Sequence, residues 1–290
     1  MSIFERESPT SETENRIKVA IAGVNGRMGR ASLTPVLTDG HFELVGAFGR
    51  QGARYVGCDI SELTDALEVG SHLGMAVSNT FEDMLLGMAP EVPDVLLDLS
   101  NAEASVVNAR AALELNIRPV IGASGLTKDH IAELSQICAQ KSIGAMVVPN
   151  FSIGAVLMME FARQAAKHYS NVEVVEMHHT KKLDAPSGTA VHTLGKIASS
   201  GKRFNEREVR EVELMPHARG AEHTSGVRVH SLRLPGLISH QEVFFGSEGE
   251  LLTIKHDSFN TKCFLKGISL SIREVMNLTE LKVGLESVLL

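Results

Sequence analysis

One stretch of the chain concentrates side chains that can transfer protons and bind anions. His178, His179, Lys181 and Lys182 fall within five positions, and Asp184 follows them. An imidazole changes its charge near neutral pH and suits general acid catalysis, whereas the ammonium group of Lys182 offers three donors for a carboxylate or a proton transfer. The pattern therefore indicates a site that binds and protonates a small anionic substrate.

A strand and a helix position this stretch. The apolar pattern predicts a strand over residues 172–177 and a helix over residues 190–199. Ser187 is a natural N-cap, which would place the N–H groups of Gly188 and Thr189 at a helix N-terminus, where anions bind readily. The simpler alternative is a solvated loop before an ordinary cap. It explains Ser187 but leaves the four basic residues without a reason.

The chain opens with a unit typical of dinucleotide binding. A strand over residues 17–22 leads into a glycine-rich turn at 23–29, a helix to about Leu37 and a second strand at 42–48. Pro35 is expected to bend this helix or end it early. The spacing G-x-x-G-x-x-G is looser than G-x-G-x-x-G and weak alone, but its strand–turn–helix–strand context favours a dinucleotide fold.

Strands and helices continue to alternate through the first half of the chain. Helices are predicted at residues 79–87, 102–116 and 127–141, and strands at 95–99, 119–123 and 145–148. The alternation predicts an α/β domain over residues 17–149 with a Rossmann-like, doubly wound parallel sheet, whose ligands bind beyond the carboxyl ends of the strands. That edge would bring together the turns at residues 23–29, 49–50, 100–101, 122–124 and 149–151.

Residues 150–261 are expected to form a second, smaller α+β domain for substrate binding and oligomerisation. It would begin with a long, Met-rich helix at residues 153–169. Strands are predicted at residues 227–234, 241–245 and 251–256. Because no helix separates them, they indicate an open sheet of mixed strand direction. The C-terminal segment 262–290, helical at its start, is expected to pack back on the first domain.

Composition excludes several classes of protein. The 290 residues are 43% hydrophobic and 22% charged, as in ordinary globular proteins, and the net charge of −7 argues against nucleic acid as the main partner. No apolar run approaches the about 18 residues of a membrane span. Three scattered cysteines favour a cytoplasmic protein without disulfides, and no cluster has the spacing of a metal site. The polar residues 1–16 are expected to be disordered.

A dinucleotide crevice beside a histidine–lysine loop indicates hydride transfer from a nicotinamide cofactor to a small anion, with a proton supplied by the protein. Two alternatives remain open. Another two-domain NAD(P)-dependent dehydrogenase, acting on homoserine, aspartate semialdehyde or a sugar, would share the glycine turn but not need the His-His-x-x-Lys stretch. A dinucleotide sensor without catalytic activity would need neither His178 nor Lys182.

Four stretches of the sequence resemble one known family. Residues 176–190, E-M-H-H-T-K-K-L-D-A-P-S-G-T-A, resemble the signature of 4-hydroxy-tetrahydrodipicolinate reductase, the dihydrodipicolinate reductase of bacterial and plant lysine biosynthesis. Residues 19–30, 148–154 and 230–243 are also similar to that family. The resemblance spans residues 17–290. It implies NAD(P)H-dependent reduction of a cyclic imine dicarboxylate to tetrahydrodipicolinate, with loss of water, in the diaminopimelate route, by an enzyme that is usually a homotetramer.

The resemblance also implies residue roles. His178 would be the proton donor and acceptor, and Lys182 the second proton donor. The substrate carboxylates would be held by His179, Gly188 and Thr189, with Ser187 close by. The cofactor pyrophosphate would lie on Gly23, Val24, Asn25, Gly26, Arg27 and Met28. The nicotinamide would be flanked by Gly122, Ala123, Ser124, Val148, Pro149, Asn150 and Phe151.

The end of the second strand departs from the family pattern. Family members often have an acidic residue followed by Arg there, whereas this chain has Gly49 and Arg50. A carboxylate at this position binds the ribose hydroxyls and repels a 2′-phosphate, and a nearby Arg accepts that phosphate. Glu43 lies at the wrong end of the strand, and Arg54 is close enough to contribute. We therefore expect NADPH to be preferred over NADH, although NADH remains possible.

Two further departures concern other positions. Ala123 and Ser124 replace the Thr-Thr often found after Gly122, and Thr261, followed by Lys262, replaces a frequent Arg. Neither position supplies the proton chemistry assigned to His178 and Lys182.

Overall fold

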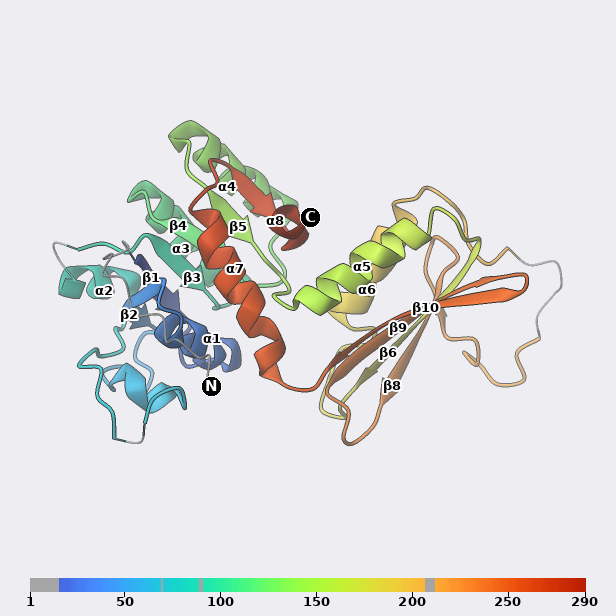
Figure 1. Ribbon diagram of the computed structural model, residues 1–290, viewed down its shortest axis with the longest axis horizontal. Helices are drawn as coiled ribbons and strands as arrows, with labels where there is room; N and C mark the ends of the chain where they lie inside the picture. The colour runs from blue at the N-terminus through green and yellow to red at the C-terminus, as the bar shows by residue number, and fades with distance from the viewer. Residues whose placement is uncertain (1–15, 69, 89–90, 207–211) are drawn as a thin grey trace, which may run out of the picture.

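The computed structural model describes residues 16–68, 70–88, 91–206 and 212–290. Except for Arg16, the N-terminal segment predicted to be disordered lies outside these residues. Two β-sheets lie at opposite ends of the molecule, and each is flanked by helices (Figure 1). The fold is the predicted α/β domain with a parallel sheet, joined to a second domain with a mixed sheet.

The first sheet has six parallel strands in the order β11-β5-β4-β3-β1-β2. Its strands are β1 (Ile17–Ala22), β2 (Phe42–Phe48), β3 (Val95–Asp98), β4 (Arg118–Ile121), β5 (Ala145–Val147) and β11 (Leu281–Val283). β3 and β4 are almost fully buried, as expected of parallel strands covered by helices on both faces. Their carboxyl ends lie at one edge of the sheet, which is the edge where ligands bind in folds of this kind.

Alternate residues of these strands face different helices. One face packs on α1 (Arg27–Thr38) and α7 (Leu265–Val275), through side chains such as Leu33 and Ile272. The other face packs on α2 (Phe81–Met88), α3 (Ala102–Glu114) and α4 (Lys128–Lys141). A short 3-10 helix, η1 (Ile60–Leu63), follows β2. The sheet is thus the middle layer of three.

The early end that Pro35 was expected to cause is not found, because α1 runs to Thr38. Pro35 is buried, and its carbonyl oxygen accepts a hydrogen bond from the N–H group of Asp39 at 3.1 Å. Proline removes only its own N–H donor from the ladder, and here that loss falls in the last turn.

The second sheet has five strands in the order β10-β9-β6-β8-β7, with β6 and β8 parallel and the other pairs antiparallel. Its strands are β6 (Asn171–His178), β7 (Ala221–Glu222), β8 (Arg228–Arg233), β9 (Ser239–Ser247) and β10 (Glu250–Ser258). β9 and β10 run longer than predicted because a two-residue turn joins them, with Gly249 at φ 80°.

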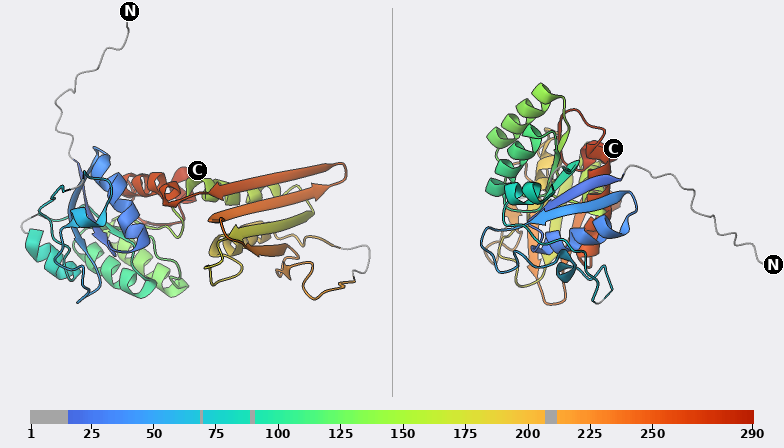
Figure 2. Two further views of the ribbon diagram at one scale, coloured as in Figure 1. Left: turned by 90° about the horizontal axis from the view of Figure 1, so that it is seen from below. Right: turned by 90° about the vertical axis from the view of Figure 1, so that its left-hand side faces the viewer.

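Helices α5 (Ile153–Ala165) and α6 (Gly188–Ala198) cover one face of this second sheet (Figure 2). In β6 the buried residues alternate, so Val172, Val174, Glu176 and His178 share the helix-facing side. α6 starts where the histidine–lysine stretch ends, which places that stretch at the end of β6 nearest the first sheet (Figure 1).

After Ser258 the chain returns to the first sheet. The 3-10 helix η2 (Thr261–Phe264) leads into α7, and β11 then pairs with β5 before the short helix α8 (Glu286–Leu289). The backbones meet closely here, since a Cβ added to Gly267 of α7 would lie 1.9 Å from the carbonyl oxygen of Phe151. Helix α7 therefore packs directly against the first crossing between the sheets, at Phe151.

Candidate active site

The glycine turn after β1 is built for close backbone approach. Gly23 has φ 71°, and a Cβ there would lie 2.9 Å from the carbonyl carbon of Leu99. A Cβ on Gly29 would lie 2.2 Å from the oxygen of Gly23. Gly26 is the N-cap of α1 and offers no side-chain cap, and the first turn of α1 has no acidic residue. The helix N-terminus is thus open to an anion such as a pyrophosphate, which fits the predicted role of residues 23–28.

Side chains around the turn fix its shape. Asn25 accepts hydrogen bonds from the guanidinium of Arg30 at 2.6 and 3.1 Å, while Arg27 is exposed and Met28 half-buried. Val24 is fully buried. The backbone N–H of Gly23 donates to the oxygen of Phe48 at 3.0 Å, which ties the turn to the end of β2. Arg50, which follows two residues later, is exposed beside this turn.

The ends of β4 and β5 form the adjoining part of the crevice. A Cβ on Gly122 would lie 2.6 Å from Leu99 and 2.7 Å from the ring of Phe151, so these segments touch. Ala123, Val148 and Phe151 are buried, Pro149 and Asn150 are half-buried, and Ser124 is exposed. The segments predicted to flank a nicotinamide therefore lie together. The amide of Asn150 donates to Oγ1 of Thr189 at 3.4 Å, which links this crevice to the start of α6.

His178 ends β6 and is held by a buried carboxylate. Glu176 is fully buried, and its Oε2 lies 2.5 Å from Nδ1 of His178, which is 8% exposed. The two residues lie two apart on one strand and so point to the same side. The contact leaves Nε2 of His178 as the nitrogen that can face a substrate.

The same carboxylate has two further partners. Nη1 and Nη2 of Arg233 approach Glu176 at 2.9 and 2.8 Å, and the N–H of Ser187 donates to Oε1 at 3.2 Å. Arg233 comes from β8, where the strand register places it beside His178. Burial by itself would raise the pKa of Glu176, but the hydrogen bonds from His178 and Arg233 lower that pKa to about 2. Glu176 is therefore a carboxylate at neutral pH.

Lys182 lies on a turn that follows the histidines. Its backbone N–H donates to the oxygen of His179 at 3.2 Å, so the segment forms a turn. Its ammonium group lies 2.9 Å from Oδ1 of Asp184, and this hydrogen bond lowers the pKa of Asp184. Arg233 also donates to the carbonyl oxygen of Asp184 at 2.8 Å. One guanidinium thus fixes both the histidine end and the lysine end of the loop.

The start of α6 offers free donors. Ser187 is the N-cap, as predicted, and its Oγ accepts from the N–H of Ala190 at 3.2 Å. Within the described part of the chain, the N–H groups of Gly188 and Thr189 have no acceptor. His179 lies nearby in sequence with a buried Nδ1 that has no hydrogen-bond partner among the described residues. Such groups are normally satisfied, so a ligand or water is expected to complete them.

Comparisons with known proteins agree with this geometry. Residues 17–151 match the family model described as dihydrodipicolinate reductase, N-terminus, and residues 154–289 match the one described as dihydrodipicolinate reductase, C-terminus. The chain belongs to the dihydrodipicolinate reductase family. The 4-hydroxy-tetrahydrodipicolinate reductase of Bacillus pumilus is 41% identical over 277 residues, covering 96% of this chain and 99% of the relative.

Two other members of the dihydrodipicolinate reductase family extend the comparison. The 4-hydroxy-tetrahydrodipicolinate reductase of Bacillus subtilis is 41% identical over 94% of this chain and 98% of its own length. The dipicolinate-bound dihydrodipicolinate reductase from Paenisporosarcina sp. TG-14 superposes with a TM-score of 0.82 at 38% identity, covering 94% of this chain and 99% of that one.

Other dehydrogenases share only the fold with this dihydrodipicolinate reductase family member. An amine dehydrogenase from Mycobacterium smegmatis matches with a TM-score of 0.61 but 17% identity. An aspartate semialdehyde dehydrogenase from Vibrio cholerae matches with a TM-score of 0.52 and 13% identity. The family assignment therefore rests on the full-length relatives. The other two-domain dehydrogenases resemble this chain in fold alone.

Three polar residues of this family member were missed in the sequence. Glu176 holds His178, Arg233 pairs with Glu176, and Asp98 ends the buried strand β3. Asp98 accepts from the N–H of Ser100 at 2.9 Å and from Nδ2 of Asn108 at 2.7 Å, and its burial raises its pKa. The available signal was an acidic residue at a position that the strand pattern assigns to the interior, because buried charges are rare without partners.

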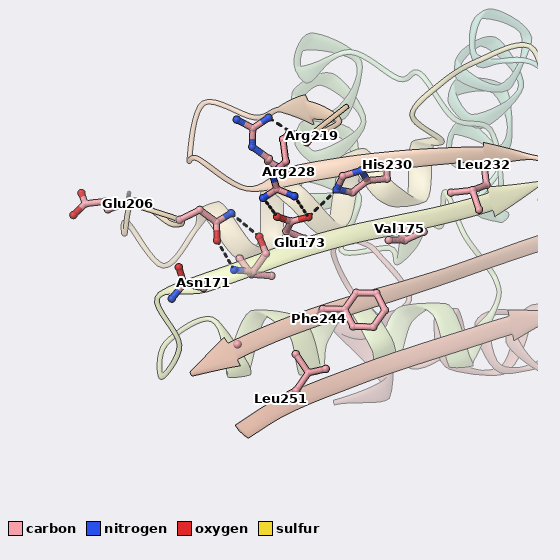
Figure 3. Close-up of a pocket in the computed structure, with 13 residues that line it drawn as sticks. Asn171, Glu173, Val175, Glu206, Arg219, Arg228, His230, Leu232, Phe244 and Leu251 are labelled. Atoms are coloured by element: carbon pink, nitrogen blue, oxygen red, sulfur yellow. Dashed lines mark hydrogen bonds and ion pairs between the residues drawn. The ribbon is translucent and has the colours of Figure 1, made fainter. Parts of the chain in front are cut away.

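A groove of this family member lies away from the predicted site. It is on the face of the second sheet opposite α5 and α6, where Glu173 meets Arg219 and His230 (Figure 3). Glu173 and Glu176 are three residues apart on β6, so their side chains point to opposite faces of the sheet. Among the described residues, no group of His, Cys, Asp and Glu could hold a metal ion, and no helix could cross a membrane.

Proposed function

We propose that this chain reduces 4-hydroxy-tetrahydrodipicolinate to tetrahydrodipicolinate at the loop between β6 and α6, with His178 and Lys182 managing the protons. As a dihydrodipicolinate reductase family member it is an NAD(P)H-dependent oxidoreductase of the lysine and diaminopimelate route. The observation that carries the residue assignment is the buried Glu176–His178 pair, which lies beside helix donors suited to a dicarboxylate.

The two domains would divide the work. Residues 17–149, with the returning segment 262–290, would hold the cofactor on the glycine turn and the ends of β4 and β5. Residues 150–261 would bind the substrate. The hydrogen bond from Asn150 to Thr189 supports this division, because it joins the edge of the nicotinamide crevice to the substrate loop. Bound NAD(P)H supplies the hydride.

The protein's own part in the reaction is proton transfer. Replacing the substrate hydroxyl by hydride, with loss of water, consumes one hydride and one proton. Nδ1 of His178 is occupied by Glu176, so Nε2 is the atom that would exchange the proton. Glu176 orients the imidazole through Nδ1, and the pairing of Glu176 with Arg233 keeps this carboxylate ionised. Lys182 would be the second donor, oriented by Asp184.

The substrate carboxylates would be held at the start of α6. The free N–H groups of Gly188 and Thr189 point from a helix of eleven residues, and a helix N-terminus favours a negative charge. His179, with Nδ1 unsatisfied among the described atoms, would take the second carboxylate, with Ser187 shaping the cap.

For the cofactor we propose NADPH in preference to NADH. β2 ends at Phe48 and is followed by Gly49 and Arg50, so the carboxylate that repels a 2′-phosphate is missing from this position. Arg50 is exposed beside the glycine turn, where its guanidinium would pair with that phosphate.

We also propose a cytoplasmic homotetramer. The open face of the second sheet presents the groove of Figure 3, and Leu251 beside it is 65% exposed. Exposed apolar side chains around a groove are typical of an interface between protein chains. Light scattering after gel filtration tests the assembly, and a monomer at micromolar concentration would refute it.

The proposed compartment rests on the cysteines. Three free cysteines fit a reducing compartment.

A substrate panel tests the function. Purified protein and NADPH are mixed with freshly made product of dihydrodipicolinate synthase, with aspartate semialdehyde or with a sugar, and absorbance at the nicotinamide band is followed. We expect rapid oxidation with the first substrate alone. Oxidation with another substrate would favour a different dehydrogenase, and binding of NADPH without any turnover would favour a dinucleotide sensor.

A further inference from the structure

A tyrosine occupies the space next to the end of β2. A Cβ built on Gly49 would lie 2.3 Å from Cε2, 2.5 Å from Oη and 2.7 Å from Cζ of Tyr55. These distances are shorter than real Cβ contacts, so a side chain at position 49 requires the ring to move. Gly49 does not have a positive φ, which means that glycine is needed here for space and not for backbone conformation.

The ring is held in this place by its hydroxyl and by the core. Oη of Tyr55 accepts a hydrogen bond from the backbone N–H of Arg50 at 2.8 Å. The ring is half-buried and packs against the core of the first domain. Since Oη serves as an acceptor for Arg50, its own hydrogen is available, and no acceptor for it is found in the described part of the chain.

The loop that carries Tyr55 is fastened beside the glycine turn. The N–H of Gly52 donates to Oδ1 of Asn79 at 2.7 Å, and the N–H of Gly57 donates to the oxygen of Val77 at 2.9 Å. Phe48, one residue before Gly49, accepts from the N–H of Gly23 in the turn at 3.0 Å. The Tyr55 hydroxyl therefore stands at the strand end where dinucleotide folds read the adenosine ribose.

We infer that Tyr55 is a cofactor-specificity residue, whose ring replaces the carboxylate that would read the ribose hydroxyls and whose hydroxyl donates a hydrogen bond to a ribose 2′-phosphate. This rests on the proposed use of NAD(P)H. Tyr55 and Arg50 then form one phosphate site, in which the phenol supplies a directed donor and the guanidinium supplies charge.

The test compares four variants by dissociation constants for NADPH and NADH, measured by nicotinamide fluorescence without substrate. Tyr55→Phe keeps the ring and removes the hydroxyl. It should weaken NADPH about tenfold and change NADH less than about twofold, because the lost bond is to a charged group. An unchanged ratio of the two constants would overturn the inference.

Two variants test whether the ring of Tyr55 excludes a carboxylate at position 49. Gly49→Asp alone should weaken both cofactors, since the new carboxylate meets the ring. Gly49→Asp combined with Tyr55→Ala should restore NADH binding and leave NADPH at least about tenfold weaker than in the unmodified protein. Tyr55→Ala alone is the control. If Gly49→Asp alone binds NADH better than the unmodified chain does, the ring does not exclude a carboxylate.

Turnover separates this inference from the proposed function. If the unmodified protein binds both cofactors but does not reduce the substrate, the proposed reaction fails while the Tyr55 result still stands. If it reduces the substrate and Tyr55→Phe leaves the ratio of dissociation constants unchanged, the reaction stands and the role of Tyr55 is refuted. Thermal unfolding of each variant verifies that it is folded at the assay temperature.

Discussion

Oε2 of Glu176 lies 2.5 Å from Nδ1 of His178, and no solvent reaches the carboxylate. The same Glu176 carboxylate is paired with both Nη atoms of Arg233. A buried carboxylate that loses one of its partners destabilises the protein strongly, so this pairing is expected to persist. Because a carboxylate only accepts hydrogen bonds, Nδ1 of His178 carries the hydrogen, and both the orientation and the tautomer of the imidazole are fixed. The proton chemistry that we propose for His178 depends on this pair.

The first prediction concerns the two proton donors. His178→Ala should lower kcat by about 10²- to 10⁴-fold with little change in the dissociation constant of NADPH, because a general acid acts mainly in the transition state. Lys182→Ala should cost at least as much, since a substrate charge partner is lost too. Steady-state kinetics and fluorescence titration measure both quantities. Unchanged turnover in both variants would refute the proposed mechanism.

The second prediction concerns the pH dependence of stability. The pKa of Glu176 is about 2 in the folded protein, against an ordinary value of 4.5. Its ionisation therefore stabilises the fold above pH 4.5, and this contribution is lost as pH falls from 4.5 through 2. Glu176→Gln should cost about 3 kcal/mol at pH 7, and about 1 kcal/mol less than that at pH 4.

Urea unfolding of Glu176→Gln and of the unmodified protein at both pH values checks this prediction. Glu103→Gln is a suitable control, because Glu103 is exposed on α3 in the first domain and does not contact His178. A deficit of Glu176→Gln that is equal at pH 7 and pH 4 would show that the carboxylate is not held ionised by its partners.

The third prediction concerns the carboxylate site at the start of α6. Pyridine-2,6-dicarboxylate should compete with the substrate, because its two carboxylates match the donors at Gly188 and Thr189 and at His179. A related reductase has been solved with dipicolinate bound. Pyridine-2-carboxylate is the matched control with one carboxylate. Inhibition by the monocarboxylate at millimolar concentration, without inhibition by the dicarboxylate, would refute the assignment.

The fourth prediction concerns cofactor choice. Arg50→Ala should weaken NADPH by about ten- to a hundredfold and spare NADH, since a charged hydrogen bond to phosphate is worth about 1.5–3 kcal/mol. Arg54→Ala, a change in the same loop, should have a smaller effect. If the unmodified protein uses NADH as well as or better than NADPH, residues other than Arg50 read the ribose.

Local patterns predicted those parts of the molecule that depend on neighbouring residues. The glycine turn, the Ser187 cap and the order of strands and helices all follow from spacing within one element and its flanks. By contrast, Arg233 meets Glu176 across 57 residues, through a pairing of β6 and β8 that no local pattern records. The strand β11 was not predicted, because its three residues are too few for a recognisable pattern and become a strand by pairing with β5.

The surroundings of some residues could not be predicted, because they depend on how side chains pack in three dimensions. The glycine at position 49 looked like a missing carboxylate, and only the structure shows that the ring of Tyr55 fills the space beside it. The histidine–lysine loop is held by Arg233, which donates to the carbonyl oxygen of Asp184 from 49 residues further along the chain. Side-chain networks of this kind depend on the tertiary fold.

The central claim is that this chain transfers hydride from the nicotinamide to the carbon from which the substrate hydroxyl departs. The most direct measurement uses NADPH carrying two deuterium atoms at C4 of the nicotinamide, with product analysed by mass spectrometry and NMR. We predict one deuterium per molecule of tetrahydrodipicolinate, located at that carbon, with one NADPH oxidised for each hydroxyl lost. Product formed without deuterium, or NADPH oxidised without loss of the hydroxyl, would contradict the account.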